Sequence, residues 1–344
     1  MKAVGYPQSL PIDHPESLLD LELPEPQAAG RDLLVEVKAV SVNPVDTKLR
    51  QRVAPAAGES RVLGWDAAGV VRAVGPEVRA FRPGDEVWYA GALSRSGSNA
   101  ELQLVDERIV GRKPRSLDFG RAAALPLTTI TAWELLFDRL GLARLNAGER
   151  TPGKEALLII GAGGGVGSVL TQLARRLTDL TVICTAGRPE TRNWLLELDA
   201  HHVIDHGLPL ADQLAALGFP TVKYVASLTE TDTYQAQIAE VIAPQGRFAL
   251  IDDPAGFDAT LFKRKSVSIH WEFMFTRAMF QTDDMIAQQR LLNAVADLVD
   301  AGHLRTTLAA HYGAINAQNL KRAHALLESG QSRGKIVLEG FATA

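Results

Sequence analysis

The pattern of apolar and polar residues changes near residue 126. Before this point the two kinds alternate with a period of two over residues 32–40 and 68–75, and Pro and Gly mark a turn near residues 82–85. This alternation predicts an antiparallel, β-rich, barrel-like domain. After Pro126, short apolar runs alternate with stretches of helical spacing, which is typical of a parallel sheet covered by helices.

We therefore expect an α/β fold in which a β-rich domain is joined to a doubly wound parallel sheet. A long helix is predicted over residues 283–301, and the apolar run at residues 334–338 could return to the first domain as a strand. Six strands are predicted for the parallel sheet, at residues 156–160, 181–186, 202–204, 222–226, 247–251 and 266–271.

A glycine cluster follows the first of these strands. Five residues, Gly163, Gly164, Gly165, Val166 and Gly167, lead into a helix whose apolar stripe begins at Val169. Small residues let a phosphate approach the main chain, and the helix N-terminus offers unpaired N–H groups to it. The order of strand, glycine turn and helix predicts a dinucleotide pyrophosphate site, although Ala162 stands where the first glycine of the strict fingerprint would be. The alternative is a loop that only connects two elements.

The end of the second strand indicates which dinucleotide is bound. A carboxylate at this place would accept the ribose 2′-hydroxyl of NADH and repel the 2′-phosphate of NADPH. This chain has Gly187 and Arg188 there, with Arg192 one helical turn later. The basic residues favour NADPH. Alternatively, Arg188 only begins a solvated helix.

Composition narrows the class of protein. A chain of 344 residues can bury two cores, and 46% hydrophobic and 22% charged residues with a net charge of −4 indicate neither nucleic acid nor an anionic membrane as partner. No apolar signal core or stretch of about twenty apolar residues is apparent, so we expect a cytoplasmic protein. The single cysteine, Cys184, excludes internal disulfides and is expected to be a small buried residue.

Four motifs stand in order along the chain: residues 43–46 (NPVD), 64–71 (GWDAAGVV), 81–87 (FRPGDEV) and 164–167 (GGVG). Together they resemble the medium-chain dehydrogenase/reductase superfamily, in particular its quinone-oxidoreductase-like branch and bacterial zinc-type alcohol dehydrogenase-like proteins. The resemblance covers nearly the whole chain. It implies an active-site cleft between a GroES-like catalytic domain and a Rossmann NADP-binding domain. The limits we expect are residues 1–126 with 273–344 for the first and 127–272 for the second.

The resemblance also implies where zinc would bind. Zinc-dependent members use Cys, His and a further Cys or Asp, and here the matching positions are Asn43, Trp65 and a position near Leu127. An amide, an indole and an alkyl chain cannot form a tetrahedral zinc site, so no zinc is expected. The histidines at 201, 202 and 206 could suggest a metal, but we favour ordinary surface histidines.

Without zinc to polarise an alcohol, hydride transfer from NADPH to a quinone or an α,β-unsaturated carbonyl is the more accessible reaction. Hydrogen-bond donors must then meet the charge that develops on the carbonyl oxygen. Candidates are Asn43, Lys48 and Tyr89, whereas Thr128 or Thr131 could contact the nicotinamide. Plainer roles are an Asn-Pro turn, a solvated lysine, strand packing and helix capping.

Several points stay open from the sequence. Asp46 and Asp66 could organise the site, but neither donates a proton at neutral pH unless its pKa is strongly raised. Relatives in the quinone reductase branch can place an Arg against the 2′-phosphate near the C-terminus, where this chain has Gly330 with Arg333 and Lys335 close by.

The resemblance alone supports a homodimer formed through the strand at 266–270. The aromatic stretch 270–275 could line an apolar pocket, or could equally be a core or dimer contact. Two other functions remain: an NADPH-binding regulatory or structural protein with little turnover, and a zinc alcohol dehydrogenase with unusual ligands.

Overall fold

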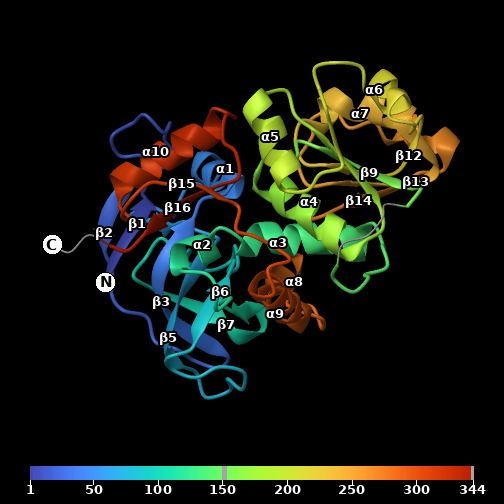
Figure 1. Cartoon of the computed structure of the whole chain (residues 1–344). Coiled ribbons are helices and arrows are strands. Elements are labelled where there is room, and N and C mark those ends of the chain that lie inside the picture. The colour runs from blue at the N-terminus through green and yellow to red at the C-terminus, as the bar shows by residue number, and fades with distance from the viewer. Residues whose placement is uncertain (149–152, 342–344) are drawn as a thin grey trace. The chain divides into compact units, whose positions relative to one another are not determined.

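The computed structural model describes residues 1–148 and 153–341 (Figure 1). Contacts divide the chain into two units: unit 1 is Met1–Ile130 with the residues from Phe275 onward, and unit 2 is Thr131–Met274. The expected domain limits, at residues 126 and 273, lie close to these divisions, and we keep them as a proposal for the functional domains.

Unit 2 is built on a six-stranded parallel sheet in the order β11-β10-β9-β12-β13-β14. Every residue of β9 and β10 is buried, as expected for parallel strands covered on both faces. This confirms the predicted doubly wound sheet. The strands are β9 (Ala156–Ile160), β10 (Thr181–Thr185), β11 (His202–Ile204), β12 (Val222–Ser227), β13 (Ile242–Leu250) and β14 (Ser268–Trp271).

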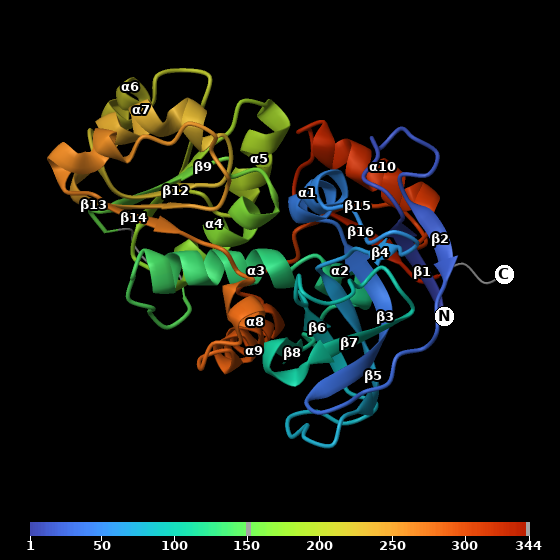
Figure 2. The same ribbon diagram turned by 180° about the vertical axis from the view of Figure 1, so that it is seen from behind.

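Helices cover both faces of this sheet. Figure 1 shows α4 and α5 on one face and α6 and α7 on the other, and Figure 2 shows the same arrangement from behind. The amphipathic α4 buries the predicted stripe from Val169 to Leu177. The bounds are α4 (Gly165–Leu177), α5 (Pro189–Glu197), α6 (Leu210–Ala216) and α7 (Thr231–Val241), with a 3₁₀ segment at Ala259–Lys265.

The fifth strand differs from its prediction. β13 begins at Ile242, whereas the pattern predicted a start at residue 247. The intervening Pro-Gln-Gly reads as a turn, and Gln245 indeed has a left-handed φ of 57°. The strand continues through this irregularity because its pairing with β12 shifts register between Val222 and Tyr224.

Unit 1 contains the predicted β-rich domain. Its main sheet has seven strands in the order β15-β16-β3-β5-β6-β8, with β7 paired to β3, and its smaller sheet has the order β2-β1-β4. The main strands are β3 (Asp32–Ser41), β5 (Ala67–Val74), β6 (Glu86–Tyr89), β7 (Leu102–Asp106), β8 (Val110–Arg112), β15 (Leu308–His311) and β16 (Lys335–Glu339). The smaller sheet contains β1 (Lys2–Tyr6), β2 (Leu19–Glu22) and β4 (Arg61–Val62).

The C-terminal part of the chain returns to unit 1, as predicted. β16 pairs antiparallel with β3, with Leu338 opposite Val40. The predicted long helix is α9 (Ile286–Asp300). The other helices associated with unit 1 are α1 (Pro44–Arg52), α2 (Phe119–Ala123), α8 (Thr276–Phe280) and α10 (Ala317–Glu328), with a 3₁₀ segment at Glu107–Ile109.

α3 (Pro126–Trp133) carries the chain from unit 1 into unit 2 and continues as a π-helical segment, Glu134–Arg139. Among the described residues, no helix combines the length and apolar character needed to cross a membrane.

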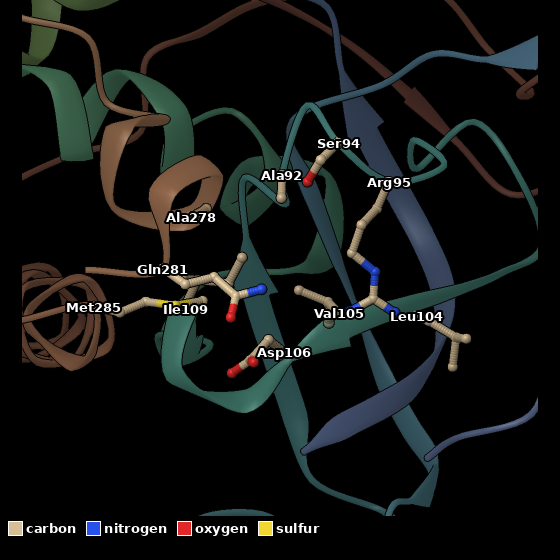
Figure 3. Close-up of a pocket in the computed structure, with 10 residues that line it drawn as sticks. All are labelled: Ala92, Ser94, Arg95, Leu104, Val105, Asp106, Ile109, Ala278, Gln281 and Met285. Carbon is tan, nitrogen blue, oxygen red and sulfur yellow. The ribbon is translucent and has the colours of Figure 1, made fainter. Parts of the chain in front are cut away.

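A cavity of about 60 Å³ lies in unit 1 beside β7 and α8 (Figure 3). Its charged side chains already have partners. Arg95 makes two hydrogen bonds to Asp32, at 2.7 and 3.0 Å, and Asp106 pairs with Arg108 at 2.7 Å. The cavity is therefore poorly suited to anchor a charged ligand.

Candidate active site

The turn between β9 and α4 has the backbone geometry of a phosphate-binding loop. Gly161 has a φ of 75°, a left-handed value that suits glycine, and it turns the chain directly after β9. Gly167 lies so close to Ala162 that an added Cβ would be 2.3 Å from the Ala162 carbonyl oxygen. This close approach lets α4 begin directly on the end of the strand.

Gly164 lies on the open side of this turn. It is the N-cap of α4, with an ordinary φ of −76°, and the nearest atom to an added Cβ would be the Gly161 carbonyl oxygen at 4.0 Å. Gly163, Gly165 and Val166 are only half-buried. Since the first turn of a helix has unpaired N–H groups, an anion can approach the main chain here. These residues fit the pyrophosphate of a dinucleotide.

α5 begins against the same turn. A Cβ on Gly163 would lie 2.3 Å from Cγ2 of Thr191, so the two segments are in close contact. Arg188 is the exposed N-cap of α5. Arg192, one turn later, donates from Nη1 to the Val203 carbonyl oxygen at 2.5 Å. The structure thus brings the helix with the predicted basic residues to the glycine turn, and one donor of Arg192 is used by the backbone.

Side chains of both helices hold the turn in place. The Trp194 indole N–H of α5 donates to Ser168 Oγ of α4 at 2.9 Å, and that hydroxyl donates to the Gly164 carbonyl oxygen at 2.7 Å. Gly161, Thr191, Ser168 and Trp194 were not among the predicted site residues. Only Gly161 had a signal in the sequence, since it directly follows the strand.

Unit 1 contains a buried polar cluster around Lys335. The Lys335 ammonium donates to the Val42 carbonyl oxygen at 2.8 Å, to Asn43 Oδ1 at 2.5 Å and to Asp66 Oδ2 at 2.9 Å. Asn43 Nδ2 donates to the same Asp66 oxygen at 2.8 Å, and Asp66 Oδ1 accepts from the Leu127 backbone N–H at 2.7 Å. The side chains of Asn43, Asp66 and Lys335 are almost completely buried.

This cluster changes the role that we assign to Asn43. Its second amide hydrogen points to the Trp65 carbonyl oxygen, 3.3 Å from Nδ2, so both of its donors are engaged within unit 1. An amide that is satisfied in this way and is 2% exposed is a poor donor to a substrate. Asn43 is better described as a positioning residue at the start of α1.

The other two predicted donors differ in exposure. The Tyr89 side chain on β6 is fully buried, its hydroxyl has no hydrogen-bond partner among the described residues, and burial raises the pKa of this phenol. Lys48 is half-buried on α1 and so keeps contact with solvent. Of the three side chains, that of Lys48 is the most exposed.

Two buried carboxyl groups lie at the same place. Burial raises the pKa of Asp46 to about 7, although the Asn43 backbone N–H donates to it at 2.7 Å and Lys335 favours its anion. Burial also raises the pKa of Asp66, while the Lys335 ammonium and the Leu127 N–H oppose this shift. Both groups are completely buried, so they organise the interior of unit 1.

The positions that would hold zinc by resemblance do not present zinc ligands. Asn43 is engaged as described, and the fully buried Trp65 packs edge-on against Phe275 with ring centroids 6.5 Å apart. Leu127 contributes a backbone N–H that donates to Asp66. Zinc requires imidazole, thiolate or carboxylate ligands, and the carboxylate nearest these positions is paired with an ammonium. The residues present therefore do not fit a catalytic zinc ion.

The remaining predicted cofactor residues lie in different environments. Thr128 and Thr131 are both buried on α3, and the Thr128 hydroxyl donates to the carbonyl oxygen of Leu125, three residues earlier, at 3.0 Å. Arg333 is exposed. All three donor hydrogens of Lys335 are engaged within unit 1, which argues against the contact with a 2′-phosphate that we expected.

The cysteine and the histidine cluster have structural partners. Cys184 is completely buried as predicted, its Sγ lies 3.3 Å from Thr171 Oγ1, and burial raises the pKa of its thiol to about 12. His201 Nδ1 accepts from the Val182 N–H at 2.9 Å, and burial lowers the pKa of this histidine to about 4. Within the described ranges, no three His, Cys, Asp or Glu side chains are grouped as a metal site requires.

Comparison with known proteins shows the family. Residues 29–115 match the alcohol dehydrogenase GroES-like domain, and residues 198–338 match the zinc-binding dehydrogenase domain. A zinc-type alcohol dehydrogenase-like protein of Staphylococcus aureus (strain MSSA476) is 40% identical over 342 residues, which cover 98% of this chain and 99% of that protein. The chain belongs to the medium-chain dehydrogenase/reductase superfamily. It is an oxidoreductase of this superfamily, and the predicted resemblance is confirmed.

Solved structures of other superfamily members share the fold. A Rhizobium etli CFN 42 protein described as a zinc-dependent alcohol dehydrogenase is 61% identical, with a TM-score of 0.95 and coverage of 100% of this chain and 99% of that chain. The Escherichia coli quinone oxidoreductase in complex with NADPH is 22% identical, with a TM-score of 0.81 and coverage of 98% of this chain and 100% of that chain. At that identity, the likeness to the quinone oxidoreductase concerns the fold alone.

Proposed function

We propose that this superfamily member is a zinc-independent, NADPH-dependent reductase of quinones or α,β-unsaturated carbonyl compounds. The observation that carries the proposal is the glycine turn of unit 2. Gly164 leaves the backbone open at the N-terminus of α4, and α5 with Arg188 begins against the same turn. This arrangement suits the pyrophosphate of a dinucleotide. The NADPH complex of the similarly folded E. coli enzyme is consistent with it.

The preference for NADPH rests on Arg188. Its side chain is exposed at the N-terminus of α5, where a guanidinium can form a charge-assisted hydrogen bond to a 2′-phosphate. Arg192 lies one turn along the same helix. Arg333, whose side chain is exposed, stays a further candidate for contact with the 2′-phosphate.

Bound NADPH would supply the hydride, and the protein has to stabilise the negative charge that develops on the acceptor oxygen. Lys48 is our candidate donor, because it is at a half-buried position of α1 and its side-chain nitrogen carries hydrogens that can be donated. Thr128 and Thr131 remain our candidates for contact with the nicotinamide.

Zinc independence is supported by the chemistry of the residues. A substrate alcohol would need a Lewis acid to lower its pKa, and the ligand positions offer an engaged amide, a buried indole and an alkyl chain. An activated alkene or quinone accepts hydride without such help. The word zinc in the names of the relatives describes those proteins, and the ligand set of this chain gives it no support.

A second candidate function is favoured by one observation. Asn43 and Tyr89, two of the three predicted donors, are buried away from solvent. A site with few donors suits an NADPH-binding regulatory protein with little turnover. In that case the glycine turn would bind the dinucleotide, and no acceptor would consume it.

We also propose that the protein is a homodimer joined through β14. This strand is at the edge of the described sheet of unit 2, and Trp271 and Phe273 at its end are 56% and 47% exposed. An unpaired strand edge beside exposed aromatic rings favours association with another strand. The cytoplasmic location stays a prediction from the sequence.

The experiment that tests the function is a substrate panel. The purified protein is incubated with NADPH, and loss of absorbance at the nicotinamide band is followed with quinones, enones, aldehydes and ketones, with NADH in parallel. We expect turnover of quinones or enones and preference for NADPH. Tight binding of NADPH without turnover would favour the regulatory alternative, and oxidation of simple alcohols in the reverse direction would contradict the proposal.

A further inference from the structure

Lys335 is a buried cation that the proposed reaction does not use. It is 3% exposed at the start of β16, in a strand whose next three residues are apolar and buried. Burying an ammonium is costly unless all of its hydrogens are bonded and an anion faces it. Here the three hydrogens bind two neutral oxygens and Asp66, which is completely buried.

Asp66 transmits this contact to α3. Its Oδ2 faces the ammonium at 2.9 Å, and its Oδ1 accepts the backbone N–H of Leu127, the second residue of α3, at 2.7 Å. The first N–H groups of a helix have no partner within the helix, and a carboxylate is favoured beside them. Asp66 therefore caps α3 from a distant part of the sequence.

We propose that Lys335 is a positioning residue that fixes the first turn of α3 through Asp66. Lys335 holds the Asp66 carboxylate in the orientation that binds the Leu127 N–H, although Lys335 follows Leu127 by 208 residues in the sequence. The same ammonium fixes the Asn43 amide, whose Oδ1 it binds at 2.5 Å. β16, α1 and α3 are thereby joined by one set of hydrogen bonds within unit 1.

The consequence for function follows from what α3 carries. Thr128 is the residue directly after Leu127, and Thr131 is one turn further along. If these threonines contact the nicotinamide, loss of the cap would misplace them, and misplacement of about 1 Å costs roughly 100-fold in rate. This kinetic consequence rests on the proposed function, whereas the position of α3 does not.

The test compares three variants with the wild-type protein. Lys335→Met removes the ammonium and keeps most of the aliphatic chain. Asp66→Asn combined with Lys335→Met replaces the ion pair by a neutral pair. Oδ1 of the new amide can still accept from the Leu127 N–H, and its Nδ2 can donate to Asn43 Oδ1 once the Asn43 amide turns by 180°. Val337→Ala, two residues along β16 at a completely buried position, is the control for general loss of stability.

The first measurement is hydrogen exchange of the backbone amides in the segment 126–133. Each variant is measured at the same number of degrees below its own melting temperature. We expect Lys335→Met to exchange at least tenfold faster than Val337→Ala in this segment, and the double variant to return to within about threefold of the wild-type rate. Equal exchange in Lys335→Met and Val337→Ala would overturn the proposal. Failure of the double variant to recover protection would overturn it as well.

The second measurement separates this proposal from the proposed function. If the protein reduces quinones or enones, we expect kcat/KM for NADPH to fall at least tenfold in Lys335→Met, to stay within twofold in Val337→Ala, and to recover in the double variant. If the wild-type protein has no turnover, and the double variant regains the exchange protection that Lys335→Met loses, the function is refuted and the positioning role is supported. Normal turnover with unaltered exchange in Lys335→Met would do the reverse.

Lys335→Met alone could fail to fold, because a buried carboxylate without its cation is strongly destabilising. The double variant then decides the question. We expect it to fold with wild-type exchange over residues 126–133. If the double variant folds but its α3 amides exchange rapidly, the cluster contributes only the neutralisation of a buried charge. The hydrogen bond to Leu127 then does not position α3, and the proposal is overturned.

Discussion

An added methyl group is expected to have different effects at two glycines of the same turn. At Gly164 the φ of −76° suits any residue, and the nearest atom to a new Cβ is 4.0 Å away. At Gly167 the new Cβ would lie 2.3 Å from the Ala162 carbonyl oxygen and 2.4 Å from its Cα. Backbone atoms cannot rotate away as a flexible side chain can. Gly164→Ala should therefore weaken NADPH binding, and Gly167→Ala should lower the free energy of unfolding.

The magnitudes follow from these contacts. Overpacking a core position costs about 1–3 kcal/mol, and we expect Gly167→Ala near the upper end of that range because the clash is with backbone. Gly164→Ala changes an N-cap and should cost less than about 1 kcal/mol of unfolding free energy. Its methyl group occupies the space through which a phosphate reaches the main chain. Loss of one charge-assisted hydrogen bond is worth about 1.5–3 kcal/mol, which is roughly tenfold or more in NADPH affinity.

Urea unfolding gives the stability, and a fluorescence titration with NADPH gives the affinity of each variant. Gly256→Ala is the control, because nothing lies within 4 Å of a Cβ added there, and both quantities should stay unchanged. If Gly164→Ala binds NADPH as tightly as the wild type while remaining folded, the dinucleotide does not bind at this turn and the reasoning fails.

Three further predictions concern charge, pH and assembly. Arg188→Ala should weaken NADPH binding by about 1 kcal/mol or more and leave the affinity for NADH nearly unchanged, as measured by titration. Arg176→Ala, at the far end of α4, is the control. Equal losses of affinity for both nucleotides would reject the 2′-phosphate contact. Burial lowers the pKa of His324 to about 3, so the folded state keeps this ring neutral while the unfolded ring takes a proton below about 6.5. The unfolding free energy should therefore be unaffected by this group above pH 6.5 and should fall as the pH drops toward 3, by about 2 kcal/mol at pH 5. The urea midpoints at pH 7.5 and pH 5 should differ less in His324→Leu than in the wild-type protein. The same difference in both proteins would contradict this prediction. Trp271→Glu with Phe273→Glu should shift the protein from dimer to monomer in light scattering, and no change in mass would remove β14 from the interface.

Local pattern was sufficient to predict much of the fold. The six strands of unit 2 and the helix at Ile286–Asp300 were visible because each is decided by the periodicity of a few neighbouring residues. β13 was predicted too short, since Pro-Gln-Gly has the local chemistry of a turn and only its pairing with β12 makes it part of a strand. Tertiary pairing overrides local preference in such segments.

The site was less predictable than the fold. The glycine turn could be read from the sequence, but the closeness of Gly163 to Thr191 depends on how α4 and α5 pack. The cluster of Asn43, Asp66 and Lys335 joins residues that are 23 to 292 positions apart. The periodicity of apolar and polar residues does not predict such contacts. From the sequence alone, a lysine close to an arginine is interpreted as one of two solvated side chains. The donors of Asn43 and Lys335 consequently had to be reassigned once their partners were known.

Our main proposal is that this chain transfers hydride from NADPH without a metal. The most direct test is the rate of NADPH consumption with a quinone or an enone, measured on protein stripped with a strong chelator and on the same protein resupplied with zinc, with metal content determined for both. We predict equal rates, with less than a tenth of an equivalent of zinc in the stripped protein. A rate that is lost on stripping and restored in proportion to bound zinc would contradict the account.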